Sequence, residues 1–111
     1  MKFALVVSAA PEASLQPARF AGAVLAEGHS LTRVFFLREG VRHGDAGSTA
    51  AAAWLSLPGA GQQFELALCI SAAERRHIEP IAAGAARFEV MGLGQLVDAL
   101  ADADRVIDFP G

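Results

Sequence analysis

The stretch FELALCISAAERR, residues 64–76, decides the fold of this chain. Its apolar run, residues 66–70, contains no charge and is bounded by polar residues, which is typical of a strand buried on both faces. Ser71 and Glu74 follow with the spacing of a capping box, in which each residue's side chain pairs with a free backbone N–H at a helix start. The stretch therefore predicts a strand whose carboxyl end leads directly into a helix that begins at Ser71.

Cys69, the only cysteine, lies at this junction of strand and helix. Backbone N–H groups and the helix dipole favour negative charge at a helix start, and the thiolate is the reactive form of cysteine. Open α/β sheets also place their ligand crevices at the carboxyl ends of strands. However, free cysteines are among the most frequently buried residues. The local pattern leaves two interpretations open, a reactive thiol and an inert structural one.

The rest of the chain alternates between apolar runs typical of strands and segments with helical spacing. Pro17 suits the first turn of a helix, and Gly28 suits the position just after its end. Residues 8–16 and 38–47 are expected to be loops, and residues 81–86 either a short helix or a turn. We expect strands at residues 3–7, 31–37, 66–70, 88–91 and 105–109, and helices at residues 18–27, 50–57, from 71 onward, and after Gly94 with Leu93, Leu96, Val97 and Leu100 on one face.

This alternation predicts one three-layer α/β/α domain over residues 1–111, built on a mainly parallel five-stranded sheet with helices on both faces. It does not fix the order of the strands. A chain of 111 residues, 53% hydrophobic and 19% charged, fits one globular domain with a modest core.

The net charge of -3 does not indicate a basic surface for nucleic acid. Arg33, Arg38, Arg42 and His43 lie close in sequence and form either a local basic patch or, as we favour, a solvated loop. A single cysteine cannot form an intrachain disulfide, which fits a reducing compartment. No stretch approaches the roughly 20 apolar residues of a membrane span, so we expect a cytoplasmic protein with no membrane segment.

Other constellations carry weaker signals. The turn at residues 92–94 lacks the third glycine and the lysine of nucleotide-binding loops, so a plain turn before a helix is favoured. His29, His43, His77 and Cys69 show no paired ligand spacing, and we expect no metal and no cofactor. His77 lies eight residues beyond Cys69, about two helical turns, and is expected to point past it.

Several segments together resemble the TusD/DsrE family of sulfurtransferase subunits. The segment around Cys69 and the run Val34-Phe35-Phe36 are the most specific parts of this resemblance. It implies a DsrE/DsrF-like (DsrEFH-like, flavodoxin-like) fold. The chain departs from the family in its short loops at Ser8–Gln16 and Arg38–Ser48, and in Leu37, which stands where the family has a tyrosine. The resemblance covers nearly the whole chain in order, in residues 1–7, 19–21, 26–29, 34–41, 68–76, 92–96 and 103–109.

In that family the matching cysteine carries sulfur as a persulfide, and Cys69 stands in its place. The resemblance implies a catalytic Cys69 that accepts sulfur from an upstream persulfide donor protein and passes it to a downstream acceptor protein. Backbone N–H groups around Ser71 and Ala72 are expected to stabilise the anionic sulfur. Arg75 and Arg76 are weaker candidates for the same role or for partner contact.

The resemblance also implies a heteromeric complex with homologous TusB- and TusC-like subunits. Such a complex feeds 2-thiolation of the tRNA wobble uridine, so that tRNA is reached only indirectly, whereas the DsrE branch serves sulfur oxidation. Two other classes stay open. One is a non-catalytic interaction subunit with an inert Cys69, and the other is a small regulatory or ligand-binding domain that uses the same crevice.

Overall fold

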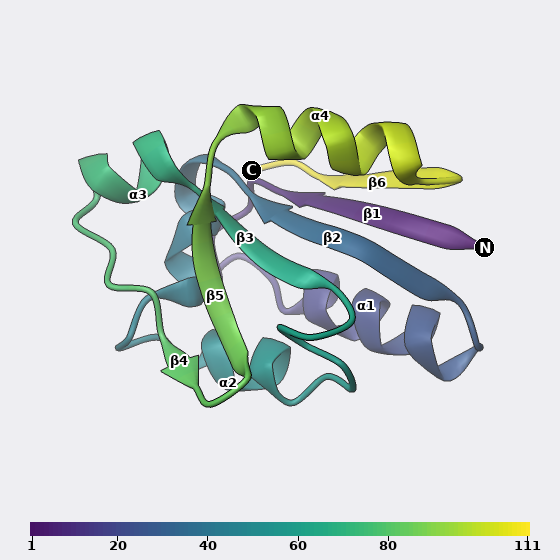
Figure 1. Cartoon of the computed structure of the whole chain (residues 1–111). Helices are drawn as coiled ribbons and strands as arrows, with labels where there is room; N and C mark the ends of the chain where they lie inside the picture. The colour runs from purple at the N-terminus through teal and green to yellow at the C-terminus, as the bar shows by residue number, and fades with distance from the viewer.

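Six strands form one sheet in the order β4-β5-β3-β2-β1-β6 (Figure 1). We describe it from a computed structural model that covers all residues, 1–111. All neighbouring strands run parallel except β4, which pairs antiparallel with β5. The strands are β1 (Lys2–Val7), β2 (Ser30–Phe36), β3 (Glu65–Cys69), β4 (Ala82–Ala83), β5 (Ala86–Met91) and β6 (Arg105–Phe109).

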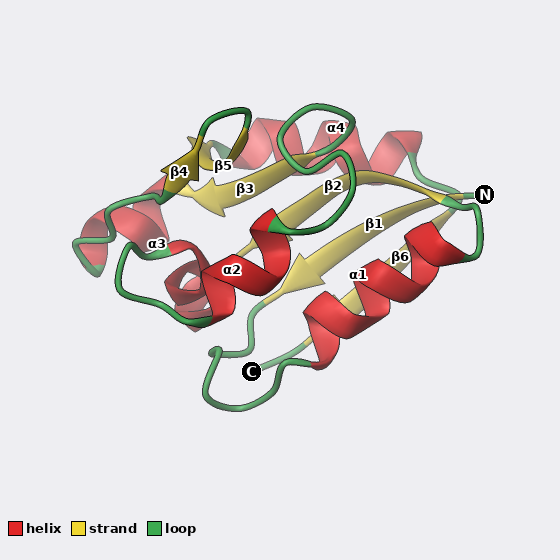
Figure 2. Cartoon of the chain, turned by 90° about the horizontal axis from the view of Figure 1, so that it is seen from below, coloured by secondary structure: helices red, strands yellow, loops and turns green.

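Helices cover both faces of the sheet, which confirms the predicted three-layer α/β fold. The helices α1 (Gln16–Ala26) and α2 (Ala50–Leu55) lie on one face, and α4 (Leu93–Asp102) lies on the other (Figures 1 and 2). The short helix α3 (Ile70–Arg75) follows β3 at the carboxyl edge of the sheet. The layers are those of flavodoxin, but the last parallel strand, β6, lies beside β1, unlike the 2-1-3-4-5 order of flavodoxin.

The number of strands exceeds the expected five by one, because residues 81–86 do not form a helix. The two-residue strand β4 is followed by a turn at Gly84, with φ +67°, and pairs antiparallel with β5. The expected signals around α1 are confirmed, since Pro17 lies in its first turn and Gly28 follows its end at φ +83°.

The apolar side of α4 is not turned fully toward the sheet. Ala99 is its only buried residue and Leu96 is half-buried, while Leu93, Val97 and Leu100 are exposed. Arg33 of β2 lies on the same side of the sheet and donates a hydrogen bond of 2.6 Å to the Gln95 carbonyl of this helix.

The segment 38–47 is not the loop that its polar residues and glycines predict, because Arg38–Gly44 forms a 3₁₀ helix, η1. Its glycines allow a close approach of backbone to the sheet. A Cβ atom on Gly40 would lie 2.0 Å from the Val7 carbonyl oxygen, and one on Gly44 would lie 2.7 Å from the Phe88 ring. These glycines therefore serve packing rather than chain flexibility.

His43 is fully buried at the centre of this packing, so its assignment to a solvated loop is wrong. The indole Nε1–H of Trp54 donates to His43 Nδ1 at 3.1 Å, and His43 Nε2 lies 3.0 Å from the carbonyl oxygen of Ala9. An indole N–H only donates and a carbonyl only accepts, so the imidazole is neutral and carries its proton on Nε2. The ring also lies 5.5 Å from Phe36 and joins the single apolar core to the β1–α1 loop.

Two glycine substitutions test the contact between η1 and the sheet. Gly40→Ala is expected to lower the free energy of unfolding by about 3 kcal/mol, because the new methyl group overlaps backbone that cannot move away. Gly47→Ala is the matched control, since nothing lies within 4 Å of its Cβ position, and is expected to stay within about 0.5 kcal/mol. Urea denaturation measures both, and equal effects would contradict this packing.

A second test concerns pH. Burial lowers the pKa of His43 below its usual value of 6.5. Below about pH 6.5 His43 binds a proton in the unfolded chain but stays neutral in the folded chain. The free energy of unfolding is therefore unaffected by His43 above that pH. It falls as the pH drops below about 6.5, and His43 accounts for at most about 1.4 kcal/mol of this loss per pH unit.

The measurement is urea denaturation at a series of pH values between about 5 and 7.5. His43→Gln, which keeps one donor and one acceptor, is expected to be less stable at neutral pH but to show a flatter dependence in this window. If both proteins lost stability in parallel, another group would be responsible.

Candidate functional site

Cys69 ends β3 and occupies the N-cap position of α3. Its neighbour on the next strand is Met91, the last residue of β5. The connection that follows β3 runs back on the face of the sheet that α2 covers, where Ala46 N–H donates a hydrogen bond of 3.0 Å to the Glu79 carbonyl. The connection that follows β5 enters α4 on the opposite face (Figure 1). Adjacent strands whose connections leave on opposite faces create the switch point where α/β sheets bind ligands. The structure thus places the only cysteine at this switch point.

The thiol points to the α4 side of the sheet. Glu65, Ala67 and Cys69 alternate onto one face, and Glu65 pairs in register with Arg33, whose side chain reaches α4. Cys69 is a free cysteine that is 8% exposed. The thiol is therefore almost covered in this conformation.

Two helix starts meet around this position. α3 begins directly after Cys69, and α4 begins at Leu93, two residues after Met91. Neither helix has a side chain hydrogen-bonded at its N-cap. The N–H groups of a first helical turn lack intrahelical partners and carry the positive end of the helix dipole, so the surroundings suit an anionic sulfur.

The capping box predicted at Ser71 and Glu74 is wrong. β3 continues directly into the helix, which starts at Ile70, so Ser71 is already its second residue and makes no cap hydrogen bond. Both side chains are exposed. Ala72 is buried in the first turn, where its N–H remains a candidate donor toward Cys69, while its carbonyl accepts a hydrogen bond of 3.1 Å from Arg76.

The two arginines lie at the far end of α3, about 9–10 Å from Cys69 along the helix axis by the rise of an α-helix. Arg76 Nε lies 2.7 Å from Glu39 Oε2, which turns this guanidinium toward η1. Arg75 is exposed and forms no ion pair, so it is the one of the two that is free for a partner. The structure brings Cys69, Ser71 and Ala72 together and leaves both arginine side chains outside that group.

Sequence reasoning missed a chain of ion pairs along the carboxyl edge of the sheet. Arg42 forms a bidentate pair with Glu12 of the β1–α1 loop and lies 3.7 Å from Glu39, which in turn pairs with Arg76. A hydrogen bond from its own backbone N–H, together with Arg42, holds the pKa of Glu12 below its usual value. Arg42 and Glu39 are only three positions apart, but the pairs that join them to Glu12 and Arg76 span 30 and 37 positions, so no local spacing in the sequence signals those two pairs.

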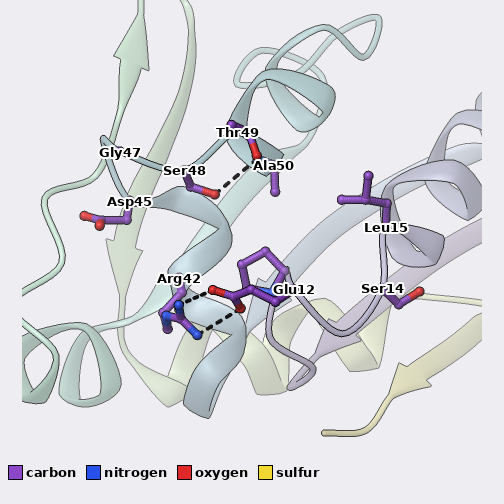
Figure 3. Close-up of a pocket in the computed structure, with 10 residues that line it drawn as sticks. Glu12, Ser14, Leu15, Arg42, Asp45, Gly47, Ser48, Thr49 and Ala50 are labelled. Carbon is purple, nitrogen blue, oxygen red and sulfur yellow. Dashed lines mark hydrogen bonds and ion pairs between the residues drawn. The ribbon is translucent and has the colours of Figure 1, made fainter.

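The largest cavity, of about 550 Å³, lies away from the cysteine. It is bounded by the β1–α1 loop and residues 42–50, with Arg42 and Glu12 facing each other at one side (Figure 3). A hollow of about 490 Å³ lies next to α3 instead, lined by Ile70 and Val90, the sequence neighbours of Cys69 and Met91. Val90 pairs in register with Leu68, so it lies on the face of the sheet opposite Cys69, and Cys69 itself does not line this hollow.

The histidines do not gather near Cys69. His77 lies just beyond the end of α3 with φ +53°, exposed to solvent. No group of three His, Cys, Asp or Glu side chains is placed to hold a metal ion. None of the helices combines the length and the apolar character that crossing a membrane requires.

Comparison with known proteins adds independent information. The sequence model of the DsrE/DsrF-like family matches residues 1–109. The chain is 34% identical to the sulfurtransferase TusD of Cronobacter sakazakii, with 98% of this chain and 100% of that protein covered. It is 33% identical to a sulfurtransferase TusD homolog of Pseudomonas aeruginosa, with 100% of this chain and 98% of that protein covered. A DsrE protein of Allochromatium vinosum is 35% identical, with 98% of both chains covered.

The fold has a solved counterpart. The crystal structure of the ychN protein of E. coli superposes with a TM-score of 0.76 and covers 98% of this chain and 99% of that one, at 21% sequence identity. The alignment with the Cronobacter protein spans 128 positions, more than the 111 residues here, so that relative contains residues that this chain lacks.

Ser71→Ala tests the corrected helix start. Because Ser71 makes no cap hydrogen bond and its side chain is exposed, the substitution is expected to change the free energy of unfolding by less than about 0.5 kcal/mol. A true N-cap serine would cost about 1 kcal/mol. Urea denaturation distinguishes the two, and a loss of the larger size would restore the capping interaction.

Proposed function

Because the chain belongs to the DsrE/DsrF-like family, whose relatives along its full length are named sulfurtransferases, we propose that it carries sulfur as a persulfide on Cys69. The observation that carries this proposal is the position of the only cysteine at the switch point, beside two helix starts. The relatives support sulfur transfer as the class of reaction, and the relay described next is the finer part of the proposal.

The relay consists of two thiol exchanges. The Cys69 thiolate attacks the outer sulfur of a donor persulfide, a new S–S bond forms, and the donor S–S bond breaks. The donor cysteine leaves as a thiolate and is protonated by solvent, while Cys69 holds the outer sulfur. An acceptor thiolate then attacks that sulfur and releases the Cys69 thiolate. One S–S bond replaces another in each step, so no external oxidant or reductant takes part.

Residues around Cys69 have distinct roles in this relay. Main-chain N–H groups in the first turn of α3, at Ser71 and Ala72, stabilise the anionic sulfur, as does the start of α4. The exposed Arg75 is available to contact a partner protein, whereas Arg76 positions α3 against η1 through Glu39.

The partners in this proposal are proteins. A heteromeric complex with homologous TusB- and TusC-like subunits, an upstream persulfide donor and a downstream acceptor would operate in the cytoplasm, and tRNA would receive the sulfur only indirectly. The net charge of -3 supports transfer to a protein rather than direct binding of tRNA. Delivery to sulfur oxidation, as the resemblance to a DsrE protein suggests, is the alternative destination.

One observation favours a second candidate, a non-catalytic subunit with an inert cysteine. Cys69 is only 8% exposed, and a buried thiol reacts slowly with any protein partner. Alkylation of the folded protein separates the candidates, because an inert thiol would react only after denaturation.

Cys69→Ser tests the proposed function directly. The wild-type chain, incubated with a cysteine desulfurase and free cysteine, is expected to gain the mass of one sulfur atom, reversible by a reductant, because the thiolate accepts persulfide sulfur. The serine variant is expected to gain none while its circular dichroism stays unchanged. Intact-protein mass spectrometry gives the readout. A gain of sulfur by the serine variant, or a wild-type thiol silent both to sulfur and to alkylation, would overturn the assignment.

A further inference from the structure

α4 exposes a continuous apolar stripe that the sheet does not use. Leu93, Val97 and Leu100 follow the i, i+4, i+7 spacing of one helix side and are 56%, 64% and 36% exposed. Val106 of β6 is 46% exposed and lies on the same face of the sheet, because its register partner Ala4 pairs in turn with Arg33. The α4/β6 surface is defined by these four residues.

The edge of the sheet next to this surface is open. β6 pairs only with β1, so the outer backbone groups of its five residues have no strand partner. The opposite edge ends in the two-residue β4, and very short edge strands are a usual protection against unwanted pairing. The apolar stripe and the long open edge thus coincide on one side of the molecule.

The net negative charge of the chain also comes from the segment that forms this surface. Residues 92–111 contain four aspartates and one arginine, whereas residues 1–91 contain eight acidic and eight basic residues. The net charge of -3 therefore comes entirely from the segment that forms α4 and β6. Asp98 and Asp108 form no ion pair, and Asp102 has only the exposed Lys2 at 3.6 Å.

We propose that the α4/β6 surface is the docking site of a different protein whose contact face is apolar and bordered by Lys or Arg. An apolar stripe with an acidic surround is complementary to such a face. A second copy of this chain would bring the same four aspartates against each other, and an anionic membrane would repel them. The proposal rests on the requirement for partner proteins in the proposed function, and not on the sulfur chemistry of Cys69.

The test uses two synthetic amphipathic peptides of about 14 residues, or four helical turns. Both have leucine on one side, and the other side is lysine in one peptide and glutamate in its match. The full-length protein is expected to bind the Leu/Lys peptide at least about ten-fold more tightly than the Leu/Glu peptide in fluorescence anisotropy, with the difference reduced at about 0.5 M salt. Bound Leu/Lys peptide is expected to slow amide exchange in residues 93–109.

Variants locate the binding site. Val97→Ser is expected to weaken Leu/Lys binding about ten-fold, because it removes the most exposed member of the stripe without disturbing the core. Val90→Ser is the matched control, since Val90 is 44% exposed in the hollow next to α3, and is expected to leave binding unchanged.

Three results would overturn the proposal. These are equal binding of both peptides, exchange protection outside α4 and β6, and a dimer of the protein alone that Val97→Ser dissociates. The last would identify a second copy as the occupant. Repeating the titration with Cys69→Ser keeps the two proposals apart, because docking is expected to persist in a protein that cannot accept sulfur.

Discussion

The carboxyl edge of the sheet depends on the buried imidazole of His43. It accepts a hydrogen bond from Trp54 of α2 and donates one to Ala9 in the β1–α1 loop, and it belongs itself to η1. Three segments from two connections, β1–β2 and β2–β3, are thereby joined at one ring in the core. A buried polar group that loses its partner costs about 1–3 kcal/mol, so neither hydrogen bond is dispensable in a domain of this size. The neutral form is required, because a proton on Nδ1 would face the indole N–H.

This constraint extends to Cys69 through η1. Gly40 brings η1 against the end of β1, and Glu39 joins it to Arg76 at the end of α3. α3 is only six residues long, and isolated helices of that length are not stable in water. It persists because its buried residues, Ala72 and Ala73, pack against the sheet and η1. The position of the cysteine at the start of α3 is therefore a property of the whole edge rather than of the local sequence.

The strands and long helices could be predicted from sequence because their signals are local. Buried parallel strands have uninterrupted apolar runs in their sequence, and Pro17 and Gly28 mark the ends of α1. The junction at Cys69 follows from the same run. The start of α3 was misplaced because a serine with a glutamate three residues later satisfies the capping pattern wherever it falls, while the direct passage from β3 into the helix makes Cys69 the N-cap.

The errors at η1 have another cause. The local sequence predicts that a histidine between an arginine and a glycine is exposed to solvent, and that a segment with several glycines is a loop. Both predictions fail here because the residues that bury this segment are distant in the sequence. His43 meets Trp54 and Ala9, and Gly40 meets Val7, only once β1, β2 and α2 have assembled. The ion pairs Glu12–Arg42 and Glu39–Arg76 belong to the same class of interaction. Such contacts require tertiary structure and cannot be inferred from spacing along the chain.

α4 shows that an amphipathic pattern specifies a helix without specifying what its apolar side contacts. The sheet beneath it presents Arg33, paired with Glu65, and the guanidinium satisfies the Gln95 carbonyl. The helix therefore meets the sheet through Ala99 and Leu96, and the side chains of Leu93 and Val97 remain exposed. Burial in the isolated chain does not explain why this side is apolar. In the proposed relay, where a nearly covered cysteine must exchange sulfur with other proteins, a surface that binds a partner on the face of the sheet toward which the thiol points does explain it.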